Sequence, residues 1–282
     1  GEAMAGSDAG RFKEVDPSAK LGYADPRYWV ARYQADSEPF DWYLRWEQLR
    51  EILAPSLSPE AEILVVGCGT SLLSEQLYQE GFMNVTNVDR CEPAVSAMRA
   101  RHQAQREAIA AAAAGGGKKA AKGASPDPPP DALEGKPAMR FEALEAQSLP
   151  QDWAERFDVV LDKALLDSIA CGQDKMKAVA GVLSSVSRVL KPKGTYVCVS
   201  WASPDMRWAM LAASDCDDRG RSKERPPASV EYGWEISHQT VARPLTNPQA
   251  DPKNKDKIEL MPSATNFVAA ESVYHLYTCT KL

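Results

Sequence analysis

The chain has 282 residues, of which 44% are hydrophobic and 26% are charged, a composition typical of a soluble globular protein. Its net charge of -6 argues against general nucleic-acid binding, which needs a basic surface to displace counterions from phosphates. No apolar run approaches the length of a membrane span, and the first ten residues lack the apolar centre of a secretory signal. We therefore expect a soluble protein without membrane or direct nucleic-acid contacts.

The N-terminal region combines a polar tail with two aromatic segments. Residues 1–20 are expected to form a disordered tail. The segments "DPRYWVARYQ" at 25–34 and "EPFDWYLRWEQLREIL" at 38–53 predict helices that form an N-terminal lid. Apolar side chains of the second segment recur at helical spacing: Trp42, Trp46, Leu49 and Leu53.

Short apolar strands and helices then alternate along the chain. "EILVVG" and "NVTNVD" are typical of buried parallel strands and end at Gly67 and Asp89. Further strands are predicted at "MRFEALE", "FDVVLD" and "TYVCVSW", and two long terminal strands contain "YGWEISHQTV" and "SVYHLYTCT". The segment 174–190 predicts an amphipathic helix whose apolar face comprises Met176, Val179, Ala180, Leu183, Val186 and Leu190.

Two polar stretches, at about 111–137 and 245–263, lack hydrophobic periodicity and are expected to be flexible insertions in one domain that spans 21–282.

The alternation of strands and helices predicts an α/β, Rossmann-like fold: a seven-strand sheet, mostly parallel, with a C-terminal antiparallel hairpin and helices on both faces. Ligands bind such sheets beyond the carboxyl ends of the strands, so Gly67 and Asp89 are expected at the binding edge.

The chain has a glycine turn and, about twenty residues later, an acid. Three kinds of ligand are considered for this motif. A dinucleotide is disfavoured because Leu72 stands where its fingerprint has a third glycine, and a phosphate-binding loop would need a Gly-Lys-Ser/Thr sequence. S-adenosylmethionine (SAM) needs close backbone approach at the turn and an acid for its ribose hydroxyls, and Gly67, Gly69 and Asp89 supply both. On these residues alone, a turn that needs glycine only for its geometry stays open.

Longer stretches carry a family resemblance. "ILVVGCGTSLLSEQLYQEGFMNVTNVD" resembles motif I and the following acidic strand of the class I, seven-strand methyltransferases. Five further stretches are together similar to the methyltransferase-like 13 group: "YWVARYQ", "FDWY", "FDVVLDKALLDS", "VSRVLKPKG" and "YGWEISH…YHLYTCTKL". The resemblance covers nearly the whole chain except the tail and the two insertions, and "LDKxxLD" with "YWxxRY" is its most specific part.

That group includes the eukaryotic elongation factor 1-alpha lysine methyltransferases, and a mitochondrial citrate synthase lysine methyltransferase is a related member. The resemblance implies a SAM-dependent enzyme that methylates a protein lysine and releases S-adenosylhomocysteine. It suggests elongation factor 1-alpha as the substrate and a cytoplasmic location, with a mitochondrial one still open. The alternatives are a small-molecule methyltransferase and a non-catalytic SAM-binding scaffold.

The resemblance also implies roles for residues at the cofactor site. Gly67 and Gly69 would approach the methionine part of SAM, and Asp89 would accept hydrogen bonds from the ribose. Arg90 would line the adenine with its backbone or stem. Glu145 stands where the family has an aspartate that reads the adenine edge together with the next backbone N–H, here that of Ala146. A solvated acid is an equal interpretation of Glu145.

The "LDKALLD" stretch supplies the catalytic candidates Asp162, Lys163 and Asp167. Asp162 would orient the ammonium of the cofactor or the substrate amine, and Lys163 would lie beside the cofactor, through its backbone. Asp167 completes the motif, and bracing of the following helix is its other interpretation. Family members have Gly-Thr where this chain has Ala164 and Leu165, which changes the local turn.

The resemblance places four lid residues over the cofactor: Trp29, Arg32, Tyr33 and Trp42. Trp29 and Tyr33 are one helical turn apart and share a face. Aromatic rings suit a sulfonium through cation–π attraction, and Arg32 could pair with the cofactor's carboxylate.

No metal site is expected, because the cysteines show no CxxC spacing. His238 and His275, on the two terminal strands, have no evident third ligand, and we interpret them as packed or rim histidines.

Overall fold

The computed structural model describes residues 22–54, 57–114, 137–214, 228–243 and 273–282. The tail predicted at 1–20 and the insertion predicted at 245–263 lie outside the described residues, as does most of the insertion predicted at 111–137. Residues 111–114 are described, and they continue the long helix α4 (Glu92–Ala114).

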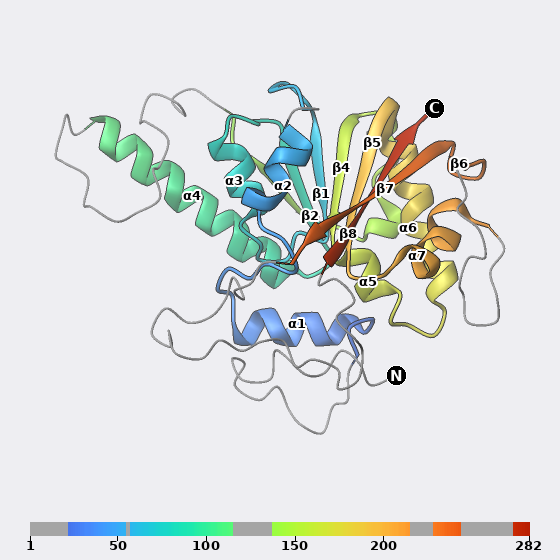
Figure 1. The fold of residues 1–282 in the computed structure, drawn as a ribbon. Coiled ribbons are helices and arrows are strands. Elements are labelled where there is room, and N and C mark those ends of the chain that lie inside the picture. Colours follow the sequence, from blue (N-terminus) through green and yellow to red (C-terminus); the bar gives the residue numbers. More distant parts are fainter. Residues whose placement is uncertain (1–21, 55–56, 115–136, 215–227, 244–272) are drawn as a thin grey trace.

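Within the described residues, one sheet of eight strands runs through the molecule in the order β3-β2-β1-β4-β5-β8-β7-β6 (Figure 1). The strands are β1 (Ile63–Val66), β2 (Val85–Asp89), β3 (Arg140–Ala143), β4 (Phe157–Lys163), β5 (Leu190–Ser200), β6 (Ala228–Ser229), β7 (Trp234–Ala242) and β8 (Val273–Lys281). β1 to β5 pair in parallel, and β8 pairs antiparallel with both β5 and β7. The mostly parallel sheet with a C-terminal hairpin is confirmed. It has one strand more than predicted, because the two-residue β6 pairs with the start of β7.

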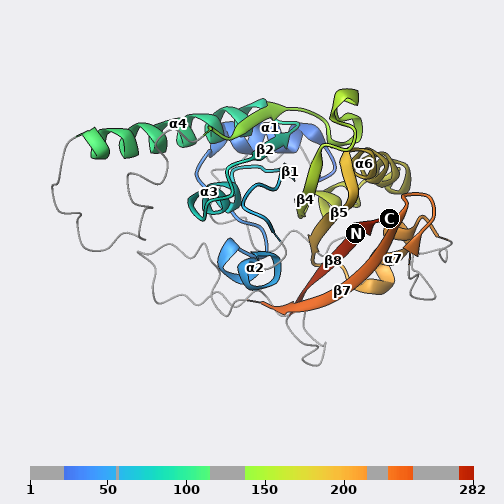
Figure 2. The same ribbon diagram turned by 90° about the horizontal axis from the view of Figure 1, so that it is seen from above.

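Helices cover both faces of the sheet, as the alternating pattern predicts. Besides α4, they are α1 (Pro26–Ala35), α2 (Trp46–Leu53), α3 (Leu73–Gln79), α5 (Leu165–Ile169), α6 (Lys175–Val189) and α7 (Pro204–Ala212). α2, α3 and α4 lie on one side, α5, α6 and α7 lie on the other, and α1 crosses one end of the strands (Figures 1 and 2). Among the described helices, none has the length and apolarity to cross a membrane.

The strand β1 shows why the central sequence is almost continuously apolar. Successive side chains of a strand point to opposite faces. Ile63 and Val65 therefore enter the core beneath α2, α3 and α4, whereas Leu64 and Val66 enter the core beneath α6 and α7. All four are buried, so neither face of this strand tolerates a polar side chain.

The predicted second N-terminal helix starts later than its apolar spacing indicates. α2 begins at Trp46, and Trp42 belongs to the irregular segment before it. The physical reason is at Tyr43, whose φ of 64° is left-handed and interrupts helical geometry. Trp46, Leu49 and Leu53 keep the predicted buried face.

The amphipathic face of α6 also differs from the predicted one at its ends. Met176 lies in the first turn and is 37% exposed, and Leu190 is the first residue of β5. The buried face consists of Val179, Val182, Leu183, Val186 and Val189. The buried apolar stripe therefore begins at Val179, one turn into α6, and continues to the last residue of the helix, Val189.

This face generates a stability prediction. Leu183 is 0% exposed, so Leu183→Ala is expected to lower the free energy of unfolding by about 2–5 kcal/mol, through lost transfer energy and an unfilled cavity. The control Met176→Ala removes a large side chain from the exposed end of the same helix and is expected to cost less than about 0.5 kcal/mol. Urea unfolding measures both; equal losses would contradict the assigned face.

Candidate functional site

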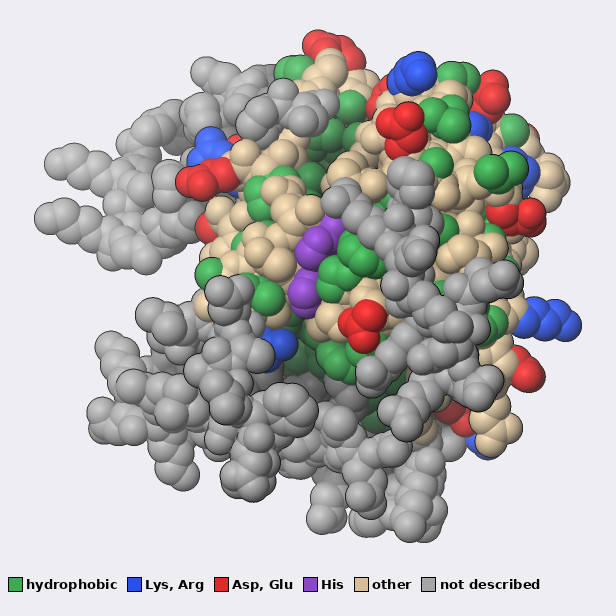
Figure 3. All heavy atoms as spheres, turned by 45° about the vertical axis from the view of Figure 1, so that its right-hand side comes forward, with side chains coloured by type: hydrophobic (Ala, Val, Ile, Leu, Met, Phe, Trp, Pro, Cys, Tyr) green, Lys and Arg blue, Asp and Glu red, His purple; other side chains and the backbone are tan. Residues whose placement is uncertain are grey.

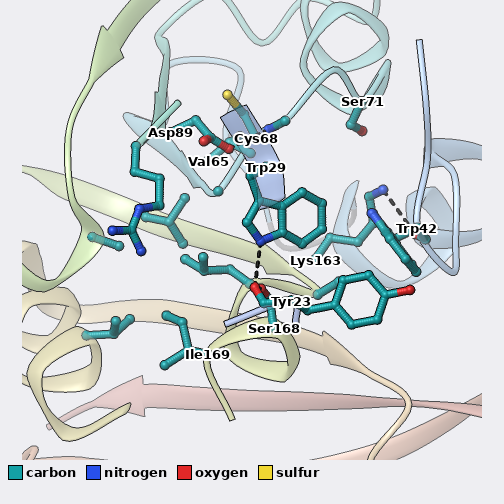
Figure 4. A pocket seen from close by; sticks show the side chains of 18 of the residues that line it. Tyr23, Trp29, Trp42, Val65, Cys68, Ser71, Asp89, Lys163, Ser168 and Ile169 are labelled. Atoms are coloured by element: carbon teal, nitrogen blue, oxygen red, sulfur yellow. Dashed lines mark hydrogen bonds between the residues drawn. The ribbon is translucent and has the colours of Figure 1, made fainter. Parts of the chain in front are cut away.

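A pocket opens at the carboxyl edge of the parallel strands. Three strand ends contribute to its wall: Gly67 follows β1, Asp89 ends β2 and Lys163 ends β4. The remaining wall comes from the N-terminal segment, the loop after β3 and α5, and includes Tyr23, Trp29, Tyr33, Phe40, Trp42, Glu145, Ala146, Leu165 and Ser168. The structure therefore brings most of the sequence-predicted cofactor residues to one place (Figure 4).

The turn after β1 requires glycine at two positions. Gly67 and Gly69 have φ values of +63° and +52°, a region that side-chain-bearing residues rarely adopt. A Cβ on Gly67 would lie 2.9 Å from Cβ of Leu165, and one on Gly69 would lie 2.6 Å from the Tyr33 hydroxyl oxygen. The turn thus allows α1 and α5 to approach the backbone closely.

The Asp89 carboxylate ties this turn to β2. Its Oδ2 accepts a hydrogen bond from the Gly69 amide at 2.9 Å, and its Oδ1 accepts one from the Cys91 amide at 2.9 Å. Burial raises the pKa of Asp89 above its ordinary value, although both backbone hydrogen bonds act in the opposite direction. Asp89 also lines the pocket, so its remaining lone pairs can accept hydrogen bonds from a ligand.

An ion pair stands at the β3 end of the pocket. An Arg90 guanidinium nitrogen lies 2.9 Å from Oε1 of Glu145, and both side chains are partly exposed. Glu145 comes two residues after β3 and precedes the short helix η3 (Ala146–Ser148). The side chain of Glu145 is therefore engaged with Arg90, whereas both residues and Ala146 still line the pocket.

Aromatic residues of the N-terminal segment roof the pocket. The rings of Trp29 and Tyr33 stack with centroids 5.9 Å apart, as their spacing on α1 predicts. Trp29 Nε1 donates a hydrogen bond to the Tyr23 carbonyl at 2.6 Å, and Ser168 Oγ donates to the same carbonyl at 2.7 Å. Figure 4 shows the Trp29 indole between Asp89 on one side and Tyr23 with Ser168 on the other.

Arg32 is not among the residues that line this pocket, and a direct contact with a bound carboxylate stays a prediction. Its side chain is 3% exposed, and Cζ lies 4.4 Å from the centroid of the Phe40 ring and 5.4 Å from that of Trp42. These contacts are cation–π distances. The guanidinium therefore supports the aromatic wall from outside the pocket.

Lys163 reaches the pocket and forms a buried ion pair there. Its Nζ lies 2.8 Å from Oδ1 of Asp41 and 3.0 Å from the Trp42 carbonyl oxygen. The exposed fractions of the two charged side chains are 6% for Lys163 and 2% for Asp41. Lys163 therefore connects β4 to the N-terminal segment through its side chain, whereas the resemblance had suggested its backbone.

Asp162 and Asp167 are not among the residues that line the pocket, and their catalytic roles stay predictions. Oδ1 of Asp162 accepts from the Leu165 amide at 2.8 Å, and Oδ2 accepts from the Tyr196 hydroxyl at 2.8 Å. Asp167 pairs with the buried Arg207 and accepts from Ser200 Oγ at 2.5 Å. Both carboxylates are used to hold α5 against β5 and α7.

Sequence reasoning missed several lining residues, above all Tyr23, Phe40 and Ser168. It also missed Asp41, which contacts the pocket residues Ser71 and Lys163. The stretch "FDWY", which contains Asp41, was recognised only as part of the family resemblance. The available signal was an acid in "FDWY" and a lysine in "LDKALLD". These two residues are 122 positions apart along the chain, so their pairing is not evident from the sequence.

His238 and His275 form a pair on β7 and β8. Nε2 of His238 lies 2.9 Å from Nδ1 of His275, and the rings stack with centroids 5.2 Å apart. Figure 3 shows two histidine side chains next to each other at the surface. Both residues are half-buried, and neither lines the pocket described above.

The pocket offers three chemical features to a ligand. The backbone around Gly67 and Gly69 permits close approach, the buried Asp89 carboxylate can accept hydrogen bonds, and stacked aromatic rings can contact a cation. Together these features suit a ligand that carries hydroxyl groups and a positive centre.

Comparisons with known proteins identify a matching family model, curated relatives and solved structures. A family model described as a methyltransferase domain matches residues 64–198. EEF1A lysine methyltransferase 4 of Bos taurus is 31% identical over 234 residues, which cover 79% of this chain and 73% of that protein. The eEF1A lysine and N-terminal methyltransferase of Danio rerio is 33% identical over 188 residues, 66% of this chain and 22% of that protein. A solved SAM-dependent methyltransferase of Methanosarcina mazei is 17% identical, with a TM-score of 0.48, over 86% of this chain and 99% of that chain.

The environment of Asp162 generates a pH prediction. Burial raises its pKa from 3.8 to about 7, although the Tyr196 hydrogen bond acts against the rise. The folded state therefore holds a proton that the unfolded chain has lost, so this residue's contribution to stability is full below about pH 4 and disappears as the pH rises through 7. Between pH 5 and 7.5, the free energy of unfolding of the wild type should fall relative to Asp162→Asn by on the order of 2 kcal/mol.

Urea unfolding at the two pH values measures this difference. Asp152→Asn, at an exposed position in the short helix η4 (Gln151–Trp153), is the matched control and should follow the wild type. If the free energies of unfolding of the wild type and of Asp162→Asn differ by the same amount at both pH values, the prediction is wrong.

Proposed function

The chain belongs to the class I family of SAM-dependent methyltransferases, and on this premise we propose that it methylates a lysine side chain of elongation factor 1-alpha. The names of its relatives support this substrate, since they are EEF1A lysine methyltransferase 4 and the eEF1A lysine and N-terminal methyltransferases. The same substrate supports a cytoplasmic location. We further propose that residues 21–282 form a single methyltransferase domain.

The observation that carries the cofactor part of this proposal is the order of pocket residues along the sheet edge. Strand order places the Arg90–Glu145 pair at the β3 side, Asp89 on β2, Gly67 after β1 and Lys163 on β4. An elongated cofactor with a base, a sugar and a charged amino-acid part fits that order. Asp89 fits the sugar because it is a buried carboxylate that still faces the pocket.

Roles for the remaining residues follow from this placement. We assign the adenine to the space beside Arg90, Glu145 and Ala146, and the methionine part to the backbone of Gly67 and Gly69. Trp29 and Tyr33 would cover the cofactor from α1, and their ring faces favour a sulfonium over a neutral thioether. The covering rings also exclude water from the pocket.

When bound, SAM would supply an electrophilic methyl group to the lone pair of a neutral amine: a nitrogen–carbon bond would form as the carbon–sulfur bond breaks, with a neutral thioether as the leaving group. The protein's part is to align the amine with that bond and to keep water away. An ammonium that enters a partly apolar pocket beside a positive centre loses its proton more readily, because both surroundings disfavour the charged form. The apolar part of the pocket lining and the neighbouring sulfonium would create such surroundings, whereas the charge of Lys163 is neutralised by Asp41.

Replacement of Asp89 tests the cofactor site. Asp89→Asn keeps the size of the side chain but removes the charge, so the affinity for S-adenosylhomocysteine is expected to fall on the order of 10- to 100-fold. Isothermal titration calorimetry measures it, with Asp152→Asn as a control that carries the same chemical change at an exposed site. Unchanged affinity in Asp89→Asn would remove the basis for this cofactor geometry.

A second experiment tests the acceptor. The purified enzyme is incubated with methyl-labelled SAM and recombinant elongation factor 1-alpha, and modified residues are mapped by mass spectrometry. We expect label on a lysine side chain, also when the N-terminus of the substrate is blocked. Label confined to the N-terminal amine, or to the small-molecule fraction of a cell extract, would refute the lysine assignment.

A further inference from the structure

Residues 38–42 form a short segment between the glycine turn and the end of β4, and the carboxylate of Asp41 contacts both. Its Oδ1 lies 2.8 Å from Nζ of Lys163, the last residue of β4. It also accepts a hydrogen bond from the Ser71 hydroxyl, and its Oδ2 lies 3.4 Å from the Leu72 amide. One side chain thus joins the N-terminal segment, the residues after the glycine turn and β4.

Asp41 lies behind the pocket wall rather than in it. It is not among the residues that line the pocket, and the exposed fraction of its side chain is 2%. Its two neighbours in the chain do line the pocket, and so do two of its side-chain partners: Phe40, Trp42, Ser71 and Lys163. A change at Asp41 therefore reaches the pocket only through residues that form the wall.

Backbone hydrogen bonds hold the same segment on either side of the ion pair. The Phe40 amide donates to the Thr70 carbonyl at 3.3 Å, and the Thr70 hydroxyl donates to the Glu38 carbonyl at 3.0 Å. The Lys163 ammonium donates to the Trp42 carbonyl at 3.0 Å (Figure 4). Lys163 therefore holds the segment twice, once through the backbone and once through the buried carboxylate.

The two charges of the pair depend on each other because both are withdrawn from water. Burial acts to raise the pKa of Asp41, but the Lys163 ammonium and the hydrogen bonds from Lys163 and Ser71 outweigh it and lower the pKa. Without this carboxylate, the ammonium would be buried with no counter-charge, which is strongly unfavourable. It would regain water only if Lys163 turned into the pocket or the segment moved away from β4, and either movement changes the pocket wall.

We propose that Asp41 is a positioning residue for the cofactor: its charge keeps Lys163 in place and keeps the segment that carries Phe40 and Trp42 against β4, in the arrangement that binds SAM. The inference rests on the proposed placement of SAM in this pocket. It gives the acid of "FDWY" and the lysine of "LDKALLD" one shared role, which neither stretch has alone.

The first variant removes the charge and little else. Asp41→Asn keeps an oxygen that can accept from the Ser71 hydroxyl, but it leaves the Lys163 ammonium without its anion. The apparent affinity falls in proportion to the fraction of molecules that keep the binding-competent arrangement. We therefore expect the affinity for S-adenosylhomocysteine, measured by isothermal titration calorimetry, to fall on the order of 10- to 100-fold.

A second substitution separates loss of position from general structural damage. The double variant Asp41→Asn/Lys163→Met removes both buried charges and keeps a long side chain at the end of β4. Replacement of a whole buried ion pair costs far less than removal of one partner. The double variant should therefore bind S-adenosylhomocysteine within about fivefold of the wild type, and more tightly than either single variant. Accumulated damage would instead make it the weakest of the three.

Asp158, near the other end of β4, supplies the matched control. Its Oδ2 lies 2.8 Å from Nζ of Lys191, both side chains are 39% exposed, and neither residue lines the pocket. Asp158→Asn thus makes the same chemical change in an aspartate–lysine pair of the same strand. Because exposed ion pairs contribute little, its affinity for S-adenosylhomocysteine should stay within about twofold of the wild type.

Three results would overturn the assignment. Wild-type affinity in Asp41→Asn would show that the charge does not position the pocket. A double variant that binds no better than the single variants would show that Asp41 does not act through Lys163. An equal loss in Asp158→Asn would make the effect a general one of ion pairs on β4.

Two further comparisons keep the outcomes distinct. If Asp41→Asn does not fold, Lys163→Met takes its place, since it leaves the opposite charge of the same pair unpartnered, and the double variant should bind more tightly than it does. If the unmodified enzyme does not bind S-adenosylhomocysteine, the proposed cofactor placement fails. If it binds and Asp41→Asn binds equally well, only the role of Asp41 fails.

Discussion

The hydrogen bond from the Gly69 amide to the Asp89 carboxylate is the contact on which the pocket depends. It links the ends of two neighbouring parallel strands and sets the path of the chain between β1 and α3. Because Gly69 has no side chain, Tyr33 can lie directly against the turn and bring α1 over the pocket. The lid helix α1, the glycine turn and the pocket acid Asp89 are therefore one packed unit rather than three separate motifs.

Much of this arrangement could be predicted from local sequence. Buried strands such as Ile63–Val66 are apolar at every position, and the acid and the glycines stand at their ends, so periodicity alone places Gly67 and Asp89 at one edge. The stacked pair of Trp29 and Tyr33 followed from helical spacing in the same way. Residues that are close in sequence share a face according to the geometry of the helix or strand that they form, and their own side chains favour that helix or strand.

The partners of charged residues could not be predicted in that way. Asp162 and Asp167 lie in a motif that resembles a catalytic one, yet their contacts are with Tyr196 and Arg207, which come from later elements. Arg32 follows the lid pattern, but Phe40 and Trp42 take its guanidinium out of the pocket. Such pairings depend on tertiary packing, and a single sequence without its fold does not show which acid meets which base.

The carbonyl of Tyr23 accepts hydrogen bonds from both the Trp29 indole and the Ser168 hydroxyl, so one oxygen atom joins the N-terminal segment to α5. Moving the N-terminal segment away from α5 has to break the Ser168 bond, whereas the Trp29 bond lies within that segment. The carbonyl that holds the Trp29 indole at the pocket is therefore itself held by α5. One backbone oxygen thus makes the position of the pocket's roof depend on the position of α5.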